Sequence, residues 1–321
     1  MNLRQSCVCF IAAGLLVWQP AWAQFPERAI KIVVPYAPGG GTDTVSRLLG
    51  HKLSESVKQS VIIDNRPGGS TITGSQLVVK SPPDGYTMLF GSTSQALNVS
   101  LFPKLPYDPL KDLAAVTLLG TSPQILVVNP SLPVRTVKEL IALAKGRKDQ
   151  LTFASGGIAS INQLAGELFK LTADVDMIHV PYKGGGPAVI DLLAGRVDVY
   201  FSSLPSALKH VQAGKLRALG ITGGRRSKAA PDVPTISEAA LPGYELLNWY
   251  ALFVPGGTAR DVVTRLNSEI VRIVKDPEIA AKLAEDGFEP VGSTPQELDA
   301  FLKAEITKNA AIVRKANIKP E

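Results

Sequence analysis

Short apolar runs alternate along the chain with longer segments whose apolar residues recur at helical spacing. Residues 30–34 predict a strand, and residues 42–54 predict a helix with one apolar face formed by Val45, Leu48, Leu49 and Leu53. The same rhythm continues to the C-terminus and is typical of an α/β fold with mainly parallel sheets. Further strands are predicted at 60–63, 86–90, 124–128, 151–154, 177–180, 197–201, 216–221 and 250–254, and further helices at 136–145, 160–171, 188–193 and 259–274.

Two long apolar segments interrupt this rhythm, at residues 116–128 and 246–254. We interpret both as strands that cross between two domains, because 321 residues are ample for two α/β units. The predicted first domain is discontinuous, with residues 24–122 and 251–321, so that the C-terminal helices pack back on it. Residues 123–250 form the second domain. A ligand cleft is expected between the two.

The N-terminus has the pattern of a secretory signal. Arg4 precedes an uncharged apolar run at residues 8–18, and Ala21-Trp22-Ala23 fits a signal-peptidase site. The alternative is a membrane anchor, for which the run is short. We expect residues 1–23 to be removed and the protein to be periplasmic.

Composition excludes several chemistries. Both cysteines, Cys7 and Cys9, lie in the predicted signal, so the mature chain is expected to have no cysteine nucleophile, cysteine zinc site or iron–sulfur cluster. The net charge of +6 comes from scattered residues without interleaved aromatics, which argues against nucleic acid as a partner.

Three glycine turns each stand between a strand-like and a helix-like run. Backbone N–H groups at such a helix start can bind an anion; the alternative for each is a tight turn alone. Lys183 precedes its glycines rather than following them, so no phosphate-binding P-loop is present, and no dinucleotide fingerprint is found. The turns are residues 34–43 (VPYAPGGGTD), 153–160 (FASGGIAS) and 180–187 (VPYKGGGP).

Catalytic constellations are absent from the sequence. His51, His179 and His210 form no metal-binding or catalytic spacing, no G-x-S-x-G elbow occurs, and no nucleophile–base pair is visible. Asp174 and Asp176 could pair two carboxylates, but a solvated loop explains them better. Trp249-Tyr250 could stack on a ligand, although packing into the core is the favoured interpretation. We predict no catalytic residue, no metal and no cofactor.

The first and third glycine turns and several further sequence blocks occur in a characteristic order. With this order the chain resembles the tripartite tricarboxylate transporter substrate-binding proteins, the Bug family of periplasmic solute receptors. The resemblance covers essentially the whole mature chain. The further blocks are residues 64–68 (DNRPG), 83–87 (PDGYT), 105–108 (LPYD), 179–184 (HVPYKG), 214–219 (GKLRAL), 232–235 (DVPT), 249–250 (WY) and 255–258 (PGGT).

The resemblance implies a type II periplasmic-binding-protein fold that closes on a small organic acid and delivers it to membrane permease subunits. A sensor kinase as partner of the loaded form is an alternative, a periplasmic hydrolase a more remote one, and a monomer is expected. The residues expected to bind the ligand are Tyr36, Ala37, Pro38, Gly39, Gly40, Gly41, Thr42, Asp43, Ser92, Ser155, Gly156, Gly157, Ser160, Asn162, Tyr182, Lys183, Gly184, Ser202 and Ser203.

Two positions depart from the family pattern. Many members resembling this chain have His at the position of Asn162 and Asp at the position of Ser202. In amino-acid-binding members that Asp faces the ligand ammonium, and a serine cannot supply its charge. The expected ligand is therefore a dicarboxylate, hydroxy acid or aromatic carboxylate without an amine.

Overall fold

A computed structural model describes residues 25–147, 150–285 and 287–319. The predicted signal at residues 1–23, with Cys7 and Cys9, lies outside the described residues. One mixed sheet runs through the described chain in the order β2-β1-β3-β9-β4-β7-β5-β6, with β8 and β10 paired to β4. The strands are β1 (Ile30–Val34), β2 (Val61–Asn65), β3 (Thr87–Ser92), β4 (Leu113–Val128), β5 (Thr152–Ser155), β6 (Ile178–Pro181), β7 (Val199–Ser203), β8 (Arg217–Ile221), β9 (Leu247–Pro255) and β10 (Glu289–Pro290).

The sheet is mixed rather than mainly parallel, which corrects the prediction from alternation. Strands β1, β2 and β3 pair in parallel, as do β5, β6 and β7. Every described pairing of β4 and β9 is antiparallel. Alternating strands and helices predict the two parallel groups correctly, but they say nothing about the long strands that link them.

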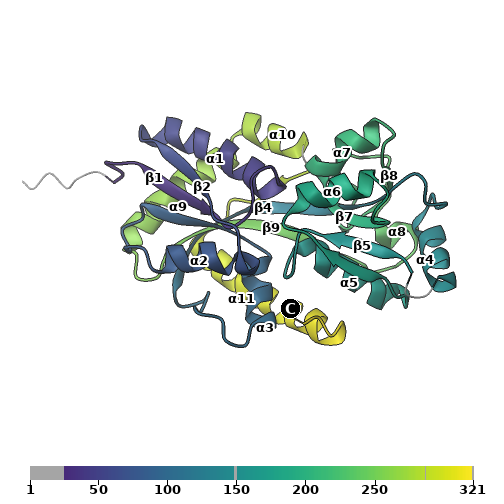
Figure 1. The fold of residues 1–321 in the computed structure, drawn as a ribbon. Helices are drawn as coiled ribbons and strands as arrows, with labels where there is room; N and C mark the ends of the chain where they lie inside the picture. The colour runs from purple at the N-terminus through teal and green to yellow at the C-terminus, as the bar shows by residue number, and fades with distance from the viewer. Residues whose placement is uncertain (1–24, 148–149, 286, 320–321) are drawn as a thin grey trace, which may run out of the picture.

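Strands β4 and β9 occupy the middle of the molecule (Figure 1) and contain the two segments predicted as crossovers. The first part of β4 pairs with β9, from Leu113 opposite Pro255 to Pro123 opposite Leu247. Its second part pairs with β7 and β8. At Gly120 a side chain is impossible, since a Cβ would lie 2.3 Å from the Glu289 carbonyl oxygen of β10.

Four helices begin at a residue whose side chain caps the first turn. Thr136 accepts a hydrogen bond from Glu139 N, and Thr294 forms a full capping box with Glu297. Ser160 accepts a hydrogen bond from Gln163 N, but its capping box is incomplete, because the Gln163 side chain accepts from Ala159 N instead. The α-helices are α1 (Gly41–Val57), α2 (Ile72–Val79), α3 (Ser94–Leu101), α4 (Val137–Gly146), α5 (Ile161–Ala173), α6 (Gly185–Leu193), α7 (Leu204–Gln212), α8 (Ile236–Ala239), α9 (Arg260–Val274), α10 (Pro277–Glu285) and α11 (Pro295–Lys315); η1 (Gly69–Thr71) is a 3-10 turn.

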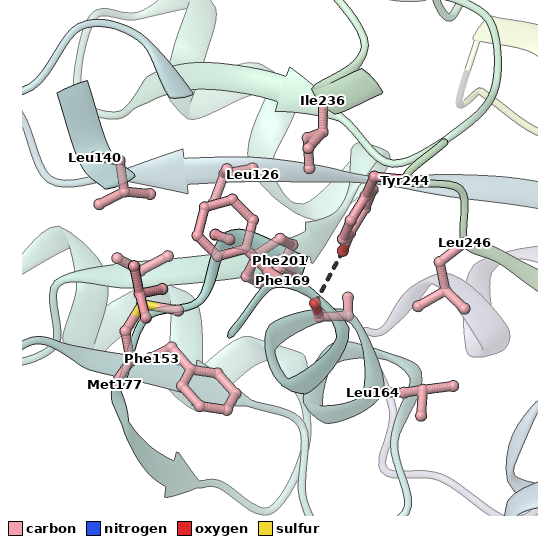
Figure 2. Close-up of a cluster of buried hydrophobic side chains, with 14 of the residues drawn as sticks. Leu126, Leu140, Phe153, Leu164, Phe169, Met177, Phe201, Ile236, Tyr244 and Leu246 are labelled. Carbon is pink, nitrogen blue, oxygen red and sulfur yellow. Dashed lines mark hydrogen bonds between the residues drawn. The ribbon is translucent and has the colours of Figure 1, made fainter. Parts of the chain in front are cut away.

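Large buried side chains form a core on each side of the central strands. One core gathers Phe153, Phe169 and Phe201 around α5 and β7, where the Tyr244 hydroxyl donates to the Ala165 carbonyl at 2.8 Å (Figure 2). On the other side, β1, β3 and β9 pack against α1 and α9. Each half therefore has an apolar core of its own.

The C-terminal helix α11 contacts both halves. Leu298 and Leu302 pack in a core with β3 and β9, whereas Val313 packs with Leu101 in the core that holds Phe153. In Figure 1 the end of α11 lies below α5. The C-terminal helices α9 and α11 thus pack on the first half, and the last turns of α11 reach the second. The domain bounds themselves stay a prediction.

Candidate ligand-binding site

Four helices begin at one cavity between the two halves. Their N-cap residues, Gly40 of α1, Ser160 of α5, Gly184 of α6 and Ser203 of α7, all line it. This inner cavity has a volume of about 90 Å³. A helix N-terminus presents unpaired N–H groups and a partial positive charge, and here four of them point toward one space. The arrangement suits an anion.

The inner cavity can attract an anion although none of its described lining residues carries a formal charge. Within the described chain, its lining includes no lysine, arginine, histidine, aspartate or glutamate. Gly40, Gly184 and Ser203 provide no side-chain cap. No cap side chain therefore accepts a hydrogen bond from the first-turn N–H groups of α1, α6 and α7. The lining residues are Tyr36, Ala37, Gly40, Gly41, Thr42, Ser92, Gln124, Gly156, Ser160, Ile161, Asn162, Gly184, Gly185, Tyr200, Ser203, Ser206, Asn248 and Tyr250.

The loop before α1 is held in shape by Asp43. Its buried carboxylate accepts hydrogen bonds from Gly39 N, Arg47 Nε and Asn65 Nδ2, each at 3.0 Å. Burial raises the pKa of Asp43, but these hydrogen bonds and the Arg47 charge outweigh it and hold the pKa below its usual value. Asp43 therefore positions the loop from behind and does not line the cavity.

Tyr36 links the two halves at the edge of the inner cavity. Its hydroxyl lies 2.5 Å from Ser92 Oγ and 2.7 Å from Ser94 Oγ. Ser94 Oγ in turn donates to the Ala159 carbonyl in the facing half at 2.8 Å. Burial raises the pKa of Tyr36, so the hydroxyl keeps its proton and remains a donor at neutral pH.

Asn162 organises the opposite wall. Its Nδ2 donates to Gln124 Oε1 at 3.0 Å and to the Phe201 carbonyl at 2.6 Å, and its Oδ1 accepts from Gly156 N at 3.4 Å. Gln124 Nε2 is buried and has no hydrogen-bond partner among the described residues. An unpaired buried donor beside a cavity is stabilised by a ligand oxygen.

The fold brings Ser155 and His179 together, a pair that the sequence does not reveal. His179 Nε2 lies 2.6 Å from Ser155 Oγ, which also accepts from Gly157 N at 3.1 Å. Burial, with a smaller effect of the Lys170 charge, lowers the pKa of His179 to about 4. Ser155 is fully buried and lines neither the inner cavity nor the second cavity that adjoins it. The pair therefore stabilises the glycine turn and does not present a nucleophile.

The predicted site residues divide into three groups. Most line the inner cavity; Gly157, Tyr182 and Lys183 line only a second cavity that adjoins it. The remainder line neither. Ser202 was expected to face the ligand, but it is fully buried and its hydroxyl donates to the Ser203 carbonyl at 3.2 Å. The residues that line neither cavity are Pro38, Gly39, Asp43, Ser155 and Ser202.

Several residues that line the inner cavity were not predicted from the sequence, because they come from strands of the sheet and not from the glycine turns. Gln124 of β4 and Asn248 of β9 are polar residues inside the apolar runs, and that interruption was the signal that could have identified them. Tyr200 belongs to β7. Trp249 is a core residue as predicted, with Nε1 donating to Glu305 Oε2 at 3.2 Å, whereas its neighbour Tyr250 lines the cavity.

The described residues contain neither a candidate metal cluster nor a membrane-spanning helix. They contain no cluster of three or more His, Cys, Asp or Glu side chains that could hold a metal ion, so Asp174 and Asp176 form no such site. Of the helices within the described ranges, none has the length and apolar character needed to cross a membrane.

The family model described as "Tripartite tricarboxylate transporter family receptor" matches residues 45–318. The chain belongs to this family. It is 36% identical to Protein BugT of Bordetella pertussis over 97% of this chain and 96% of that protein. A Rhodopseudomonas palustris protein solved with malate has 32% identity and a TM-score of 0.84, covering 90% of this chain and all of the other.

A second solved structure, an R. palustris protein with adipate, has 36% identity and a TM-score of 0.89 over 92% of this chain and 100% of that one. The receptor fold inferred from the resemblance is thereby confirmed. This receptor is accordingly a solute-binding protein of a tripartite tricarboxylate transporter and not an enzyme.

Proposed function

We propose that the receptor binds a small organic acid without an amine and that one carboxylate of this acid occupies the inner cavity. The observation that carries the proposal is the convergence of the α1, α5, α6 and α7 N-termini on an uncharged space. Backbone and hydroxyl donors there replace the hydration shell of a carboxylate.

The absence of an amine follows from the lining. An ammonium group needs an anionic partner when it is buried, and the described lining of the inner cavity contains no carboxylate. Ser202 does not line the cavity, so the exclusion of an amine rests on the lining residues and not on Ser202. Adipate and malate, the acids bound by the two similar R. palustris proteins, also lack an amine and support the proposal.

The proposed setting is the periplasm, with residues 1–23 as the export signal. It is supported by the apolar run at 8–18 and by the periplasmic members of the family. The proposed partners are the permease subunits of the transporter, and the proposed state is a monomer. A sensor kinase that reads the loaded receptor is the alternative partner, and co-purification with either membrane protein, with and without ligand, separates the two.

A thermal-shift panel tests the proposed ligand class. Succinate, malate, adipate and benzoate are compared with aspartate and glutamate at equal concentrations. An acid at about 100 times its Kd stabilises the protein by about 2.7 kcal/mol, which raises Tm by about 5–10 °C. Shifts for amine-free acids alone support the proposal. Tighter binding of aspartate or glutamate than of every amine-free acid contradicts it.

A further inference from the structure

A second, larger cavity opens directly from the ligand site. This outer cavity has a volume of about 540 Å³. It shares walls with the inner cavity at Tyr36, Ala37, Gly156, Ser160 and Gly184. If one carboxylate of a ligand occupies the inner cavity, the rest of a longer ligand therefore extends into the outer cavity.

The walls of the outer cavity differ in character from those of the inner one. They are mainly apolar, with Pro35, Pro67 and the partly exposed Ile158 among them. Lys183 is the single charged residue of this lining within the described chain, and it is exposed and makes no ion pair with a described residue. A mainly apolar wall with one cation suits an anionic group carried on an apolar spacer.

Unusual backbone geometry flanks this cavity on both sides. Ser70 and Thr71, on one wall, have φ of 53° and 76°, and Ala159, between the lining residues Ile158 and Ser160, has φ of 59°. Non-glycine residues in this region cost about 1–3 kcal/mol each and persist only where their surroundings hold them. Asn98 Nδ2 holds the first wall by donating to the Ser70 carbonyl at 2.8 Å. The walls are thus fixed rather than free surface loops.

We propose that the outer cavity is a second binding chamber for the distal half of the ligand. The apolar spacer of a dicarboxylic acid lies along Pro35, Pro67 and Ile158, and its second carboxylate pairs with Lys183. This inference rests on the proposed function, since the first carboxylate must occupy the inner cavity. It narrows the substrate class to elongated dicarboxylates with an apolar middle and makes Lys183 a specificity-determining residue.

The first test is a calorimetric series of straight-chain dicarboxylates from succinate to suberate, with hexanoate as the monocarboxylate reference. Burial of each added methylene is expected to tighten binding about threefold to fourfold until the chamber is spanned. Adipate is expected to bind at least about tenfold more tightly than hexanoate, because only adipate can pair with Lys183.

The second test removes the cation. Lys183→Gln is expected to weaken adipate and suberate binding about tenfold and to leave hexanoate unchanged. Lys209→Gln, at an exposed position near the end of α7, is the matched control and is expected to change neither. Unchanged Tm of both ligand-free variants establishes that they fold.

Three results overturn the second chamber and leave the proposed function intact. The first is a dicarboxylate affinity that does not depend on chain length. The others are a Lys183→Gln protein that loses affinity for adipate and hexanoate equally, and one that loses affinity for neither. The last of these would assign Lys183 to a surface outside ligand binding. Absence of binding by every amine-free acid overturns the proposed function as well, so the two failures are distinguishable.

Discussion

Asn162 Nδ2 donates to Gln124 Oε1 at 3.0 Å, and this bond fixes which end of the Gln124 amide is left over at the cavity wall. The leftover end is Nε2, a buried donor without a partner among the described residues. A side chain from the central strand β4 is thereby oriented by helix α5 as a donor for the ligand.

Gln124→Glu is expected to weaken carboxylate binding by at least about tenfold. The substitution keeps size and the Asn162 bond but replaces the leftover donor with a negative charge that repels the ligand. Calorimetric titration with adipate gives the change in Kd. Gln212→Glu adds the same charge at an exposed position and is expected to have little effect. Equal affinities of the two variants would remove Gln124 from the site.

Gly41→Ala is expected to weaken ligand binding about tenfold. A Cβ at this position would lie 3.3 Å from the Tyr250 hydroxyl and 3.6 Å from Ser203, so it crowds the contact between the two halves beside the cavity. Gly186→Ala is the control, because a Cβ there meets nothing within 4 Å. Titration of both variants with the same acid checks the prediction, and a Gly41→Ala protein with unchanged Kd contradicts it.

Asp43→Asn is expected to lower stability by about 1.5–3 kcal/mol, since the loop loses charge-assisted hydrogen bonds to Gly39 N and Arg47. The corresponding fall in Tm is about 3–10 °C. Affinity should fall with it, because Asp43 shapes the start of α1. Asp232→Asn, at an exposed position, is the control. Lost affinity at unchanged Tm would instead indicate direct ligand contact by Asp43.

His179 predicts a pH dependence of stability. Its pKa is about 4 in the folded protein and about 6.5 when unfolded, so the unfolded chain takes up the proton first as pH falls. The stabilisation from neutral His179 is complete above about pH 6.5 and is lost as pH falls toward 4. Allowing for its partial exposure, the loss is roughly 2 kcal/mol.

Urea unfolding at pH 7 and pH 4.5 measures this dependence. His179→Gln is expected to flatten it, whereas His210→Gln, on α7, is expected to keep it. A wild-type pH profile in the His179→Gln protein would show that other groups carry the dependence.

The elements themselves follow closely from local pattern. The predicted strand at 30–34 coincides with β1, and the helix predicted at 259–274 differs from α9 by one residue. Helices α2, α3, α7, α8, α10 and α11 were not predicted, since all but α11 are short and the apolar face of α11 is shared between two cores. The glycine turns were placed correctly because a glycine after an apolar run marks a strand-to-helix turn wherever it occurs.

The sequence alone determined the α/β class, the position of the three glycine turns and the family. Each of these depends on residues close together in the chain. Only the tertiary structure decided that four helix N-termini meet, that Gln124 and Tyr250 join them, and that Asp43, Ser155 and Ser202 stand behind the site. Those facts depend on how β4 aligns with β7 and β9, which lie far from it in the chain, and the pairing of distant strands leaves no local signal.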